Sequence, residues 1–265
     1  MINLSNGHGL VFCAASGALA YDGKGWAWEY PLCWMGALDP SLFTVITKTL
    51  TRQPRKGNLY WYHPWTCVKQ IGREGWVNAV GLTNPGIEWW CRKHGPTAGA
   101  QGIPIIVSIT ADTVPELVKM GRMVVGSASH IVGIEFNPSC PNTESSARMT
   151  ENAGLVIEQT LALKEAIGEM PLLIKLSVVQ NAERILQGVQ GCVEAVQINS
   201  VPWHVAFPNK QSPLHRLGGG GVSGKVAQQH TWRFIERLVK ASTIPVIGCS
   251  VWEYEGDCRR VGDSA

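Results

Sequence analysis

The sequence lacks the features that mark membrane proteins and nucleic-acid-binding proteins. Its 265 residues carry a net charge of only +3, and no run of Lys and Arg is longer than two residues, which argues against a nucleic-acid partner. The apolar stretch at residues 10–21 is too short to span a bilayer, and no Lys or Arg precedes it. We therefore expect a cytoplasmic protein without a membrane anchor.

A metal-binding pattern of cysteines is also missing. Eight Cys are scattered through the chain without any C-x-x-C pair, so we expect no zinc or iron–sulfur site within it. In a chain of this length, such spacing indicates reduced and mostly packed thiols. The hydrophobic content of 45% is typical of a soluble globular protein, and the length fits one large α/β barrel.

Short apolar runs alternate with helical patterns along the chain, and this alternation predicts a parallel sheet. Strands are predicted at residues 9–15, 44–47, 103–109, 131–136, 172–176, 195–198 and 244–247, and helices at 84–94, 114–124, 147–167, 182–189, 225–240 and 251–261. The fold class that fits best is α/β, as a single domain over residues 1–265 that forms an incomplete (β/α)8 TIM barrel of about seven strands. A doubly wound open sheet is the alternative.

Residues 49–81 form a connection far longer than a βα loop usually is. A connection of this length is either a functional cover or disordered. Because it contains Trp61, Trp65 and Trp76, we expect a packed cover over the active-site face.

Polar side chains stand at the C-terminal ends of the predicted strands, namely Ser16, Lys48, Asn137, Lys175 and Asn199. In a (β/α)8 barrel these ends share one face, and that face holds the active site. An open sheet would instead gather its ligand at one switch point. Lys175 lies inside an apolar strand, where a buried ammonium needs an anion or dipoles nearby. Lys48 is either a solvated strand end or a cation that faces a ligand, and Asn199 could equally satisfy neighbouring backbone.

The loop at residues 137–143, NPSCPNT, combines two amides with one thiol. Asn137 and Asn142 can hold a polar planar ligand through paired donors and acceptors. The thiolate of Cys140 can accept a proton or attack a substrate. The alternative is a turn after a core strand with a buried, inert cysteine.

Two turns are candidates for binding an anion. The glycine-rich run at residues 218–224 precedes a predicted helix, so its backbone N–H groups could approach a phosphate, although a flexible loop would look the same. Residues 248–250 follow the last predicted strand, where barrels often bind phosphate.

Seven motifs in the same order resemble the dihydroorotate dehydrogenase family over roughly residues 9–250. They are ASG at 15–17, TKTLT at 47–51 with RKGN at 55–58, NAVGLTNPG at 78–86, NPSCPNT at 137–143, IKLS at 174–177, NSVPW at 199–203 and GGVSG at 220–224. Each motif alone is weakly specific, but seven in register are strongly specific.

The resemblance implies an FMN enzyme that oxidises dihydroorotate to orotate in pyrimidine synthesis. By motif position, Cys140 is the base that removes the C5 proton while hydride passes from C6 to flavin N5, as in the cytosolic, cysteine-based branch of the family. Lys48 would meet the orotate carboxylate and the flavin edge, and Lys175 would lie beside flavin N1 and O2. The remaining implied contacts are Asn78, Asn137, Asn142 and Asn199 to the pyrimidine, Ala15, Ser16 and Gly17 to the isoalloxazine, and Gly221, Ser223, Gly248 and Ser250 to the ribityl phosphate.

The sequence departs from the family pattern at its C-terminal end. Cys249 occupies a turn that is glycine-rich in the family, and no eighth strand or last helix follows, so we expect weak FMN retention and poor stability from residues 1–265 alone. Two other functions stay open, a related dihydropyrimidine or dihydrouridine flavoenzyme and a non-catalytic remnant. The electron acceptor is open between fumarate and NAD, the second of which would require an electron-transfer subunit, and a homodimer is equally open.

Overall fold

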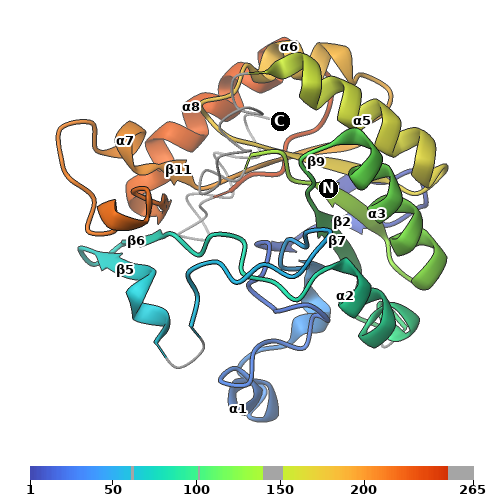
Figure 1. The fold of residues 1–265 in the computed structure, drawn as a ribbon, viewed down its shortest axis with the longest axis horizontal. Helices are drawn as coiled ribbons and strands as arrows, with labels where there is room; N and C mark the ends of the chain where they lie inside the picture. The colour runs from blue at the N-terminus through green and yellow to red at the C-terminus, as the bar shows by residue number, and fades with distance from the viewer. Residues whose placement is uncertain (61–62, 101, 140–151, 250–265) are drawn as a thin grey trace.

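The computed structural model describes residues 1–60, 63–100, 102–139 and 152–249, and its centre is a parallel sheet that curls into part of a barrel (Figure 1). In spatial order its strands are β10 (Ala195–Ile198), β9 (Leu172–Leu176), β8 (Gly133–Phe136), β7 (Ile105–Ile109), β4 (Thr44–Ile46) and β3 (Cys13–Ala14). Every neighbouring pair is parallel, and spatial order follows chain order. This is the arrangement of an incomplete (β/α)8 barrel.

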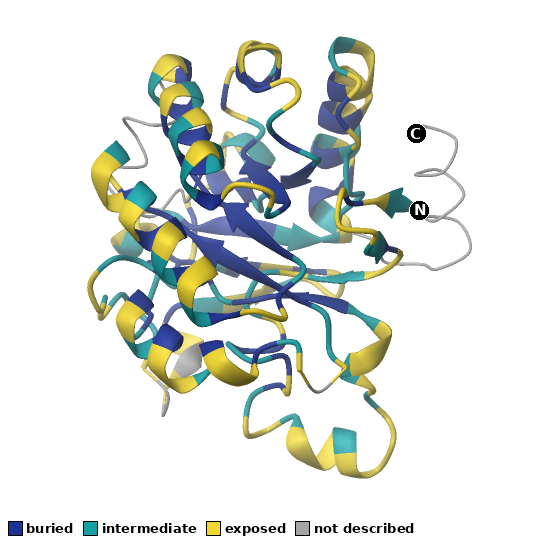
Figure 2. Ribbon diagram, turned by 90° about the vertical axis from the view of Figure 1, so that its right-hand side faces the viewer, coloured by how far each residue is buried: buried dark blue, intermediate teal, exposed yellow. Residues whose placement is uncertain are grey.

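Helices cover the outer face of this sheet, each with its exposed side turned to solvent (Figure 2). They are α2 (Ile87–Lys93), α3 (Val114–Ser127), α5 (Ala153–Ile167), α6 (Ala182–Gly188) and α8 (Lys225–Ala241). Side-chain caps start three of them, because Thr113 accepts from Glu116 N, Asn152 from Leu155 N and Asn181 from Arg184 N. The large core between sheet and helices is apolar, and Trp90, Phe136 and Leu163 are among its fully buried members.

Most predicted elements are confirmed within a few residues. The strands at 172–176 and 195–198 have the predicted bounds, because each is a continuous buried run. At residues 244–247 the structure has an isolated parallel bridge between Val196 and Val246 instead of a strand. This bridge still lies beside β10, at the position of the next barrel strand. The predicted helix at 251–261 lies outside the described residues.

The prediction of one strand over residues 9–15 is wrong. Gly9–Leu10 forms β2, which pairs antiparallel with β1 (Ile2–Asn3), and only the two residues of β3 join the parallel sheet. The β1–β2 hairpin packs Leu4 and Leu10 against the inner face of the sheet. Ser5 ties it to the start of β10, since its N–H and Oγ–H both donate to the Glu194 carboxylate.

The long connection at residues 49–81 contains regular structure. Leu50 extends β4 along β7 through a bridge to Ile109, and an antiparallel hairpin follows, made of β5 (Val68–Ile71) and β6 (Gly75–Asn78). Trp65 and Trp76 are 59% and 44% exposed, so they do not supply the packing expected of them, and Trp61 lies outside the described residues.

The hairpin belongs to a second sheet of four antiparallel strands, in the order β11 (Val201–Pro202), β12 (Gly221–Gly224), β6 and β5. The glycine-rich run is therefore partly a strand and not a free loop. Gly220 shows why glycine is needed, because a Cβ there would lie 2.5 Å from the Asn78 carbonyl oxygen and its φ is +85°. Close approach of β12 to β6 depends on this absence of a side chain.

The remaining elements are short. They are α1 (Tyr30–Trp34), α7 (Trp203–Ala206) and the 3-10 helices η1 (Pro40–Leu42), η2 (Pro64–Thr66), η3 (Gly95–Thr97) and η4 (His215–Leu217). Within the described ranges, no helix combines the length and the apolar character that crossing a bilayer requires.

Candidate active site

The inside of the partial barrel has two layers of side chains with opposite character. Successive residues of a strand point to opposite faces, so residues two apart share a face. The first layer, here called the lower layer, is an apolar cluster of Leu4, Leu10, Ile46, Ile106, Leu173 and Ala195. Two residues further along β7, β8, β9 and β10 lies the upper layer, which consists of Ser108, Glu135, Lys175 and Gln197. All four upper-layer residues are buried.

An ion pair forms the centre of the upper layer. Lys175 Nζ lies 4.0 Å from Glu135 Oε1; the lysine is 7% exposed and the glutamate 0%. Burial raises the pKa of the Glu135 carboxyl, while the charge of Lys175 and a hydrogen bond from Ser108 act in the opposite direction. Within the part of the chain that the structure describes, Lys175 Nζ donates no hydrogen bond and Glu135 is its one anionic partner.

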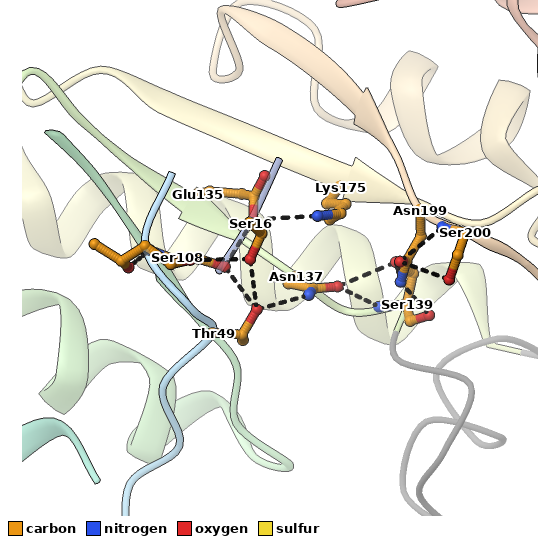
Figure 3. Close-up of polar contacts among 10 residues, drawn as sticks. Ser16, Thr49, Ser108, Glu135, Asn137, Ser139, Lys175, Asn199 and Ser200 are labelled. Atoms are coloured by element: carbon orange, nitrogen blue, oxygen red, sulfur yellow. Dashed lines mark hydrogen bonds and ion pairs between the residues drawn. The ribbon is translucent and has the colours of Figure 1, made fainter. Parts of the chain in front are cut away.

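A chain of hydroxyl groups connects this pair to the ends of the neighbouring strands (Figure 3). Ser108 Oγ donates to Glu135 Oε1 at 2.7 Å and lies 2.9 Å from Thr49 Oγ1. Thr49 Oγ1 also accepts from Asn137 Nδ2 at 3.0 Å and lies 3.3 Å from Ser16 Oγ. The network therefore joins the C-terminal ends of β3, β4, β7 and β8, as the barrel prediction requires.

Two of the four candidate amides, Asn137 and Asn199, are linked through Ser139. Asn137 Oδ1 accepts from Ser139 N at 3.3 Å and from Ser139 Oγ at 3.1 Å. Asn199 Nδ2 donates to Ser139 O at 3.0 Å, and Asn199 Oδ1 accepts from Ser200 N at 2.9 Å. These contacts fix both amide planes at the same edge of the sheet. The residue that follows Ser139 is Cys140.

Lys48 lies against the loop that carries Ser16. A Cβ on Gly17 would lie 3.2 Å from Lys48 Cβ, and Lys48 N donates to Ala20 O at 2.9 Å. The charge of Lys48 also reaches the buried Cys67 thiol, whose pKa is raised by burial and lowered in part by that ammonium. Cys67 comes from the segment at 49–81, so this segment approaches the site.

The other predicted site residues fall into three groups. Asn78 lies on the antiparallel sheet, where its Nδ2 donates to Gly221 O at 3.3 Å, and Ser223 lies on the same strand as Gly221. Ala15 is exposed beside Ser16, and Gly248 is half-buried just after the bridge to β10. Cys140, Asn142 and Ser250 lie outside the described residues.

Sequence reasoning missed four members of the network. Glu135 gave a signal of the same kind as Lys175, namely a charged residue inside an apolar strand. Thr49, Ser108 and Ser139 gave none, because hydroxyl residues are common in strands and turns. Together, the described groups place a buried cation, fixed amides and small hydroxyls at the C-terminal ends of the barrel strands. This end of the partial barrel is here called the mouth. This set suits a flat ligand with carbonyl oxygens or an anionic edge.

Comparisons with known proteins agree with this picture. The family Dihydroorotate dehydrogenase matches residues 33–250. Dihydroorotate dehydrogenase B (NAD(+)), catalytic subunit, of Geobacillus kaustophilus is 28% identical over 239 residues, which cover 88% of this chain and 71% of the relative. A Pediococcus pentosaceus protein that carries the name dihydroorotate dehydrogenase A (fumarate) is 29% identical over 246 residues, with 88% and 74% covered.

Solved structures give the same fold. Ligand-free DHODH from Eimeria tenella superimposes with a TM-score of 0.72 at 12% identity, over 100% of this chain and 79% of that one. The complex of the Eimeria tenella enzyme with ferulenol gives 0.65 at 13% identity, over 83% and 66%. At these identities the similarity concerns the fold alone.

Proposed function

The chain belongs to the dihydroorotate dehydrogenase family, and we propose that it is an FMN-dependent enzyme that oxidises dihydroorotate to orotate in pyrimidine synthesis. The observation that carries this proposal is the upper layer of the barrel. It offers a buried ammonium, Lys175, which has only one distant carboxylate partner among the described residues. A buried cation of this kind stabilises negative charge on a ligand at the mouth.

The described residues fit FMN in the chemistry of their donors. We expect Lys175 to lie at the pyrimidine edge of the flavin, beside N1 and O2, and Ala15, Ser16 and Gly17 to line its ring. The phosphate would be held by backbone and hydroxyl groups at Gly221, Ser223, Gly248 and Ser250. When bound, FMN supplies a two-electron acceptor next to the substrate.

The chain's own residues would orient dihydroorotate and remove a proton from it. We expect Asn78, Asn137, Asn142 and Asn199 to hold its amide edges, and Lys48 to hold its carboxylate. Cys140 would take the proton from C5. Support for its placement comes from Ser139, which is anchored between Asn137 and Asn199 directly before it. The 49–81 segment would exclude water from this step.

The visible spectrum of the protein with FMN supplied, before and after addition of dihydroorotate without oxygen, tests the proposal. We expect a flavin band that bleaches. Bound flavin without bleaching would favour a related dihydropyrimidine or dihydrouridine enzyme, and a protein that binds no supplied flavin would favour a non-catalytic remnant.

Replacement of the proposed base sharpens this experiment. Cys140→Ala should slow bleaching by about 10²–10⁴-fold, the usual contribution of general base catalysis. Cys33→Ala is the control, because Cys33 is a free thiol in α1. For the intact enzyme, the rate should rise with pH above neutrality as the thiol ionises. A rate independent of pH from 6 to 9, with chemistry rate-limiting, would contradict Cys140 as the base.

The electron acceptor separates two forms of this function. The relatives include one named for fumarate and one named as the catalytic subunit of an NAD(+) enzyme. Reoxidation of the reduced protein by fumarate alone would support a self-sufficient cytoplasmic enzyme. Failure with fumarate, and reoxidation only with an added electron-transfer subunit, would support the NAD-linked form.

A further inference from the structure

Glu135 is a buried carboxylate that the proposed reaction does not use. It stands on β8, between Ser108 on β7 and Lys175 on β9. Its Oε1 accepts from Ser108 at 2.7 Å and faces Lys175 at 4.0 Å. Its Oε2 is fully buried and has no hydrogen-bond partner among the described residues. A carboxylate with one oxygen left unpaired is costly to keep ionised, so its charge depends on the cation beside it.

The groups around Glu135 leave Lys175 as the one charge that balances it. Ser108 on β7 and Gln197, which is in register with Lys175 on β10, are neutral. Burial, together with the charge of Glu135, raises the pKa of the Cys13 thiol on β3 to about 11. Cys13 is therefore neutral near pH 7. Among the described residues, the interior thus holds one cation and one anion.

A ligand that gains a negative charge at the mouth changes this balance. Lys175 would then have an anion on each side, and two anions near one cation repel each other. The more deeply buried anion is the one that binds a proton more readily, because water cannot stabilise its charge. Glu135 meets this condition, since it is 0% exposed and its oxygen Oε2 is available for the proton.

We propose that Glu135 is a positioning residue of the flavin site, which acts as the counter-ion of Lys175 and takes up one proton from water when the flavin is reduced. The inference rests on the proposed function, because dihydroorotate supplies the two electrons. Hydride transfer from dihydroorotate would add one negative charge to the flavin, and the proton taken up from water at Glu135 would balance that charge, while the C5 proton goes to Cys140. No covalent bond to Glu135 forms. If Glu135 had a purely structural role, it would only hold β8 beside β9 and would take up no proton when the flavin is reduced.

The equilibrium between oxidised and reduced flavin, measured against pH in the FMN-loaded protein, tests the proton uptake. One extra proton makes this equilibrium constant change by a further tenfold per pH unit, or about 30 mV for a two-electron couple. We expect wild type to show this dependence between pH 6 and 8 and Glu135→Gln to lose it. Glu88→Gln should retain it, because Glu88 pairs with Arg52 at the surface. Equal slopes in wild type and Glu135→Gln would overturn the proposal.

A measurement without flavin tests separately whether Lys175 is the counter-ion that keeps Glu135 ionised. A protonated carboxyl group gives an infrared carbonyl band that an ionised carboxylate lacks. We expect this band in Lys175→Met near pH 7 and its loss in the double variant Lys175→Met/Glu135→Gln. With Lys175 present, Glu135 should be ionised. The infrared spectra of wild type and Glu135→Gln should therefore not differ by such a band. Absence of the band in Lys175→Met would show that Glu135 does not depend on Lys175. Failure to bind FMN would refute the proposed function, yet it would leave this second result intact.

Discussion

The two layers inside the barrel come largely from the same strands and are both buried, but the lower layer is apolar and the upper layer is polar. On β7 the residue Ile106 is followed two positions later by Ser108, and on β9 the residue Leu173 is followed by Lys175. The lower layer buries hydrocarbon, which stabilises the fold. The upper layer buries polar groups that cost free energy unless partners or a ligand compensate. Burial alone therefore does not identify the core of this protein; the position along the strand does.

The largest effect is expected from a change in the lower layer. Leu173→Ala should lower the free energy of unfolding by about 2–5 kcal/mol, because it removes buried methyl groups and leaves a cavity. Urea denaturation would measure this loss. Leu161→Ala is the matched control, since Leu161 is 41% exposed on α5 and should cost far less. Equal losses in the two variants would remove the distinction between the lower layer and the surface.

The next effect concerns the upper layer and should appear in rate more than in stability. If the proposed function holds, Lys175→Met should slow the reduction of bound FMN by dihydroorotate about 100-fold or more, because the variant loses the buried charge proposed to stabilise the reduced flavin. Anaerobic stopped-flow bleaching would measure it. Lys240→Met, in the last turn of α8, serves as the control. If both variants react as fast as wild type, the upper layer does not carry the chemistry.

The smallest expected effect is a difference between the two layers in how the free energy of unfolding depends on pH. Burial raises the pKa of Glu135 above its value of 4.5 in the unfolded chain, so folding favours its protonated form. Its contribution to stability is complete below pH 4.5 and declines as pH rises through the raised pKa. The difference between wild type and Glu135→Gln should therefore change by at most about 1.4 kcal/mol per pH unit.

Flavin-free denaturation curves between pH 4.5 and 8 would measure this trend. Leu173→Ala should run parallel to wild type over the same range, because no titrating group is changed. A Glu135→Gln curve parallel to wild type would mean that the carboxyl has the same pKa in the folded and unfolded chain.

The sequence predicted the parallel half of the fold well, and the reason is local. Leu172–Leu176 and Ala195–Ile198 are short runs with a single polar residue each, and α3, α5 and α6 carry their own side-chain caps. The antiparallel sheet was missed, and its central pairing, between β12 and β6, joins segments that are distant in the sequence. Gly221 faces Asn78 across 143 positions, and no local pattern records that partner.

The site was predictable to a similar degree. The polar strand ends Ser16, Asn137 and Asn199 were expected on one face, and the structure brings them into one hydrogen-bonded network with Thr49. The need of Lys175 for an anion was also expected. Its partner could not be identified, because which residue of β8 faces it depends on the register between β8 and β9. That register is set by the packing of both strands.

The β1–β2 hairpin has a consequence for the electrostatics of the whole interior. Leu4 and Leu10 belong to the lower layer, where they pack with Ile46, Ile106, Leu173 and Ala195 on the side of the upper layer away from the strand ends. Both side chains are buried and apolar, and an apolar medium with a low dielectric constant strengthens the attraction between charges. Removal of the first ten residues would expose the lower layer to water. The electrostatic coupling between Glu135 and Lys175 would then weaken, although neither residue would be changed. The amino-terminal segment would thus influence the proposed reaction through the polarity of the interior, without contacting the substrate.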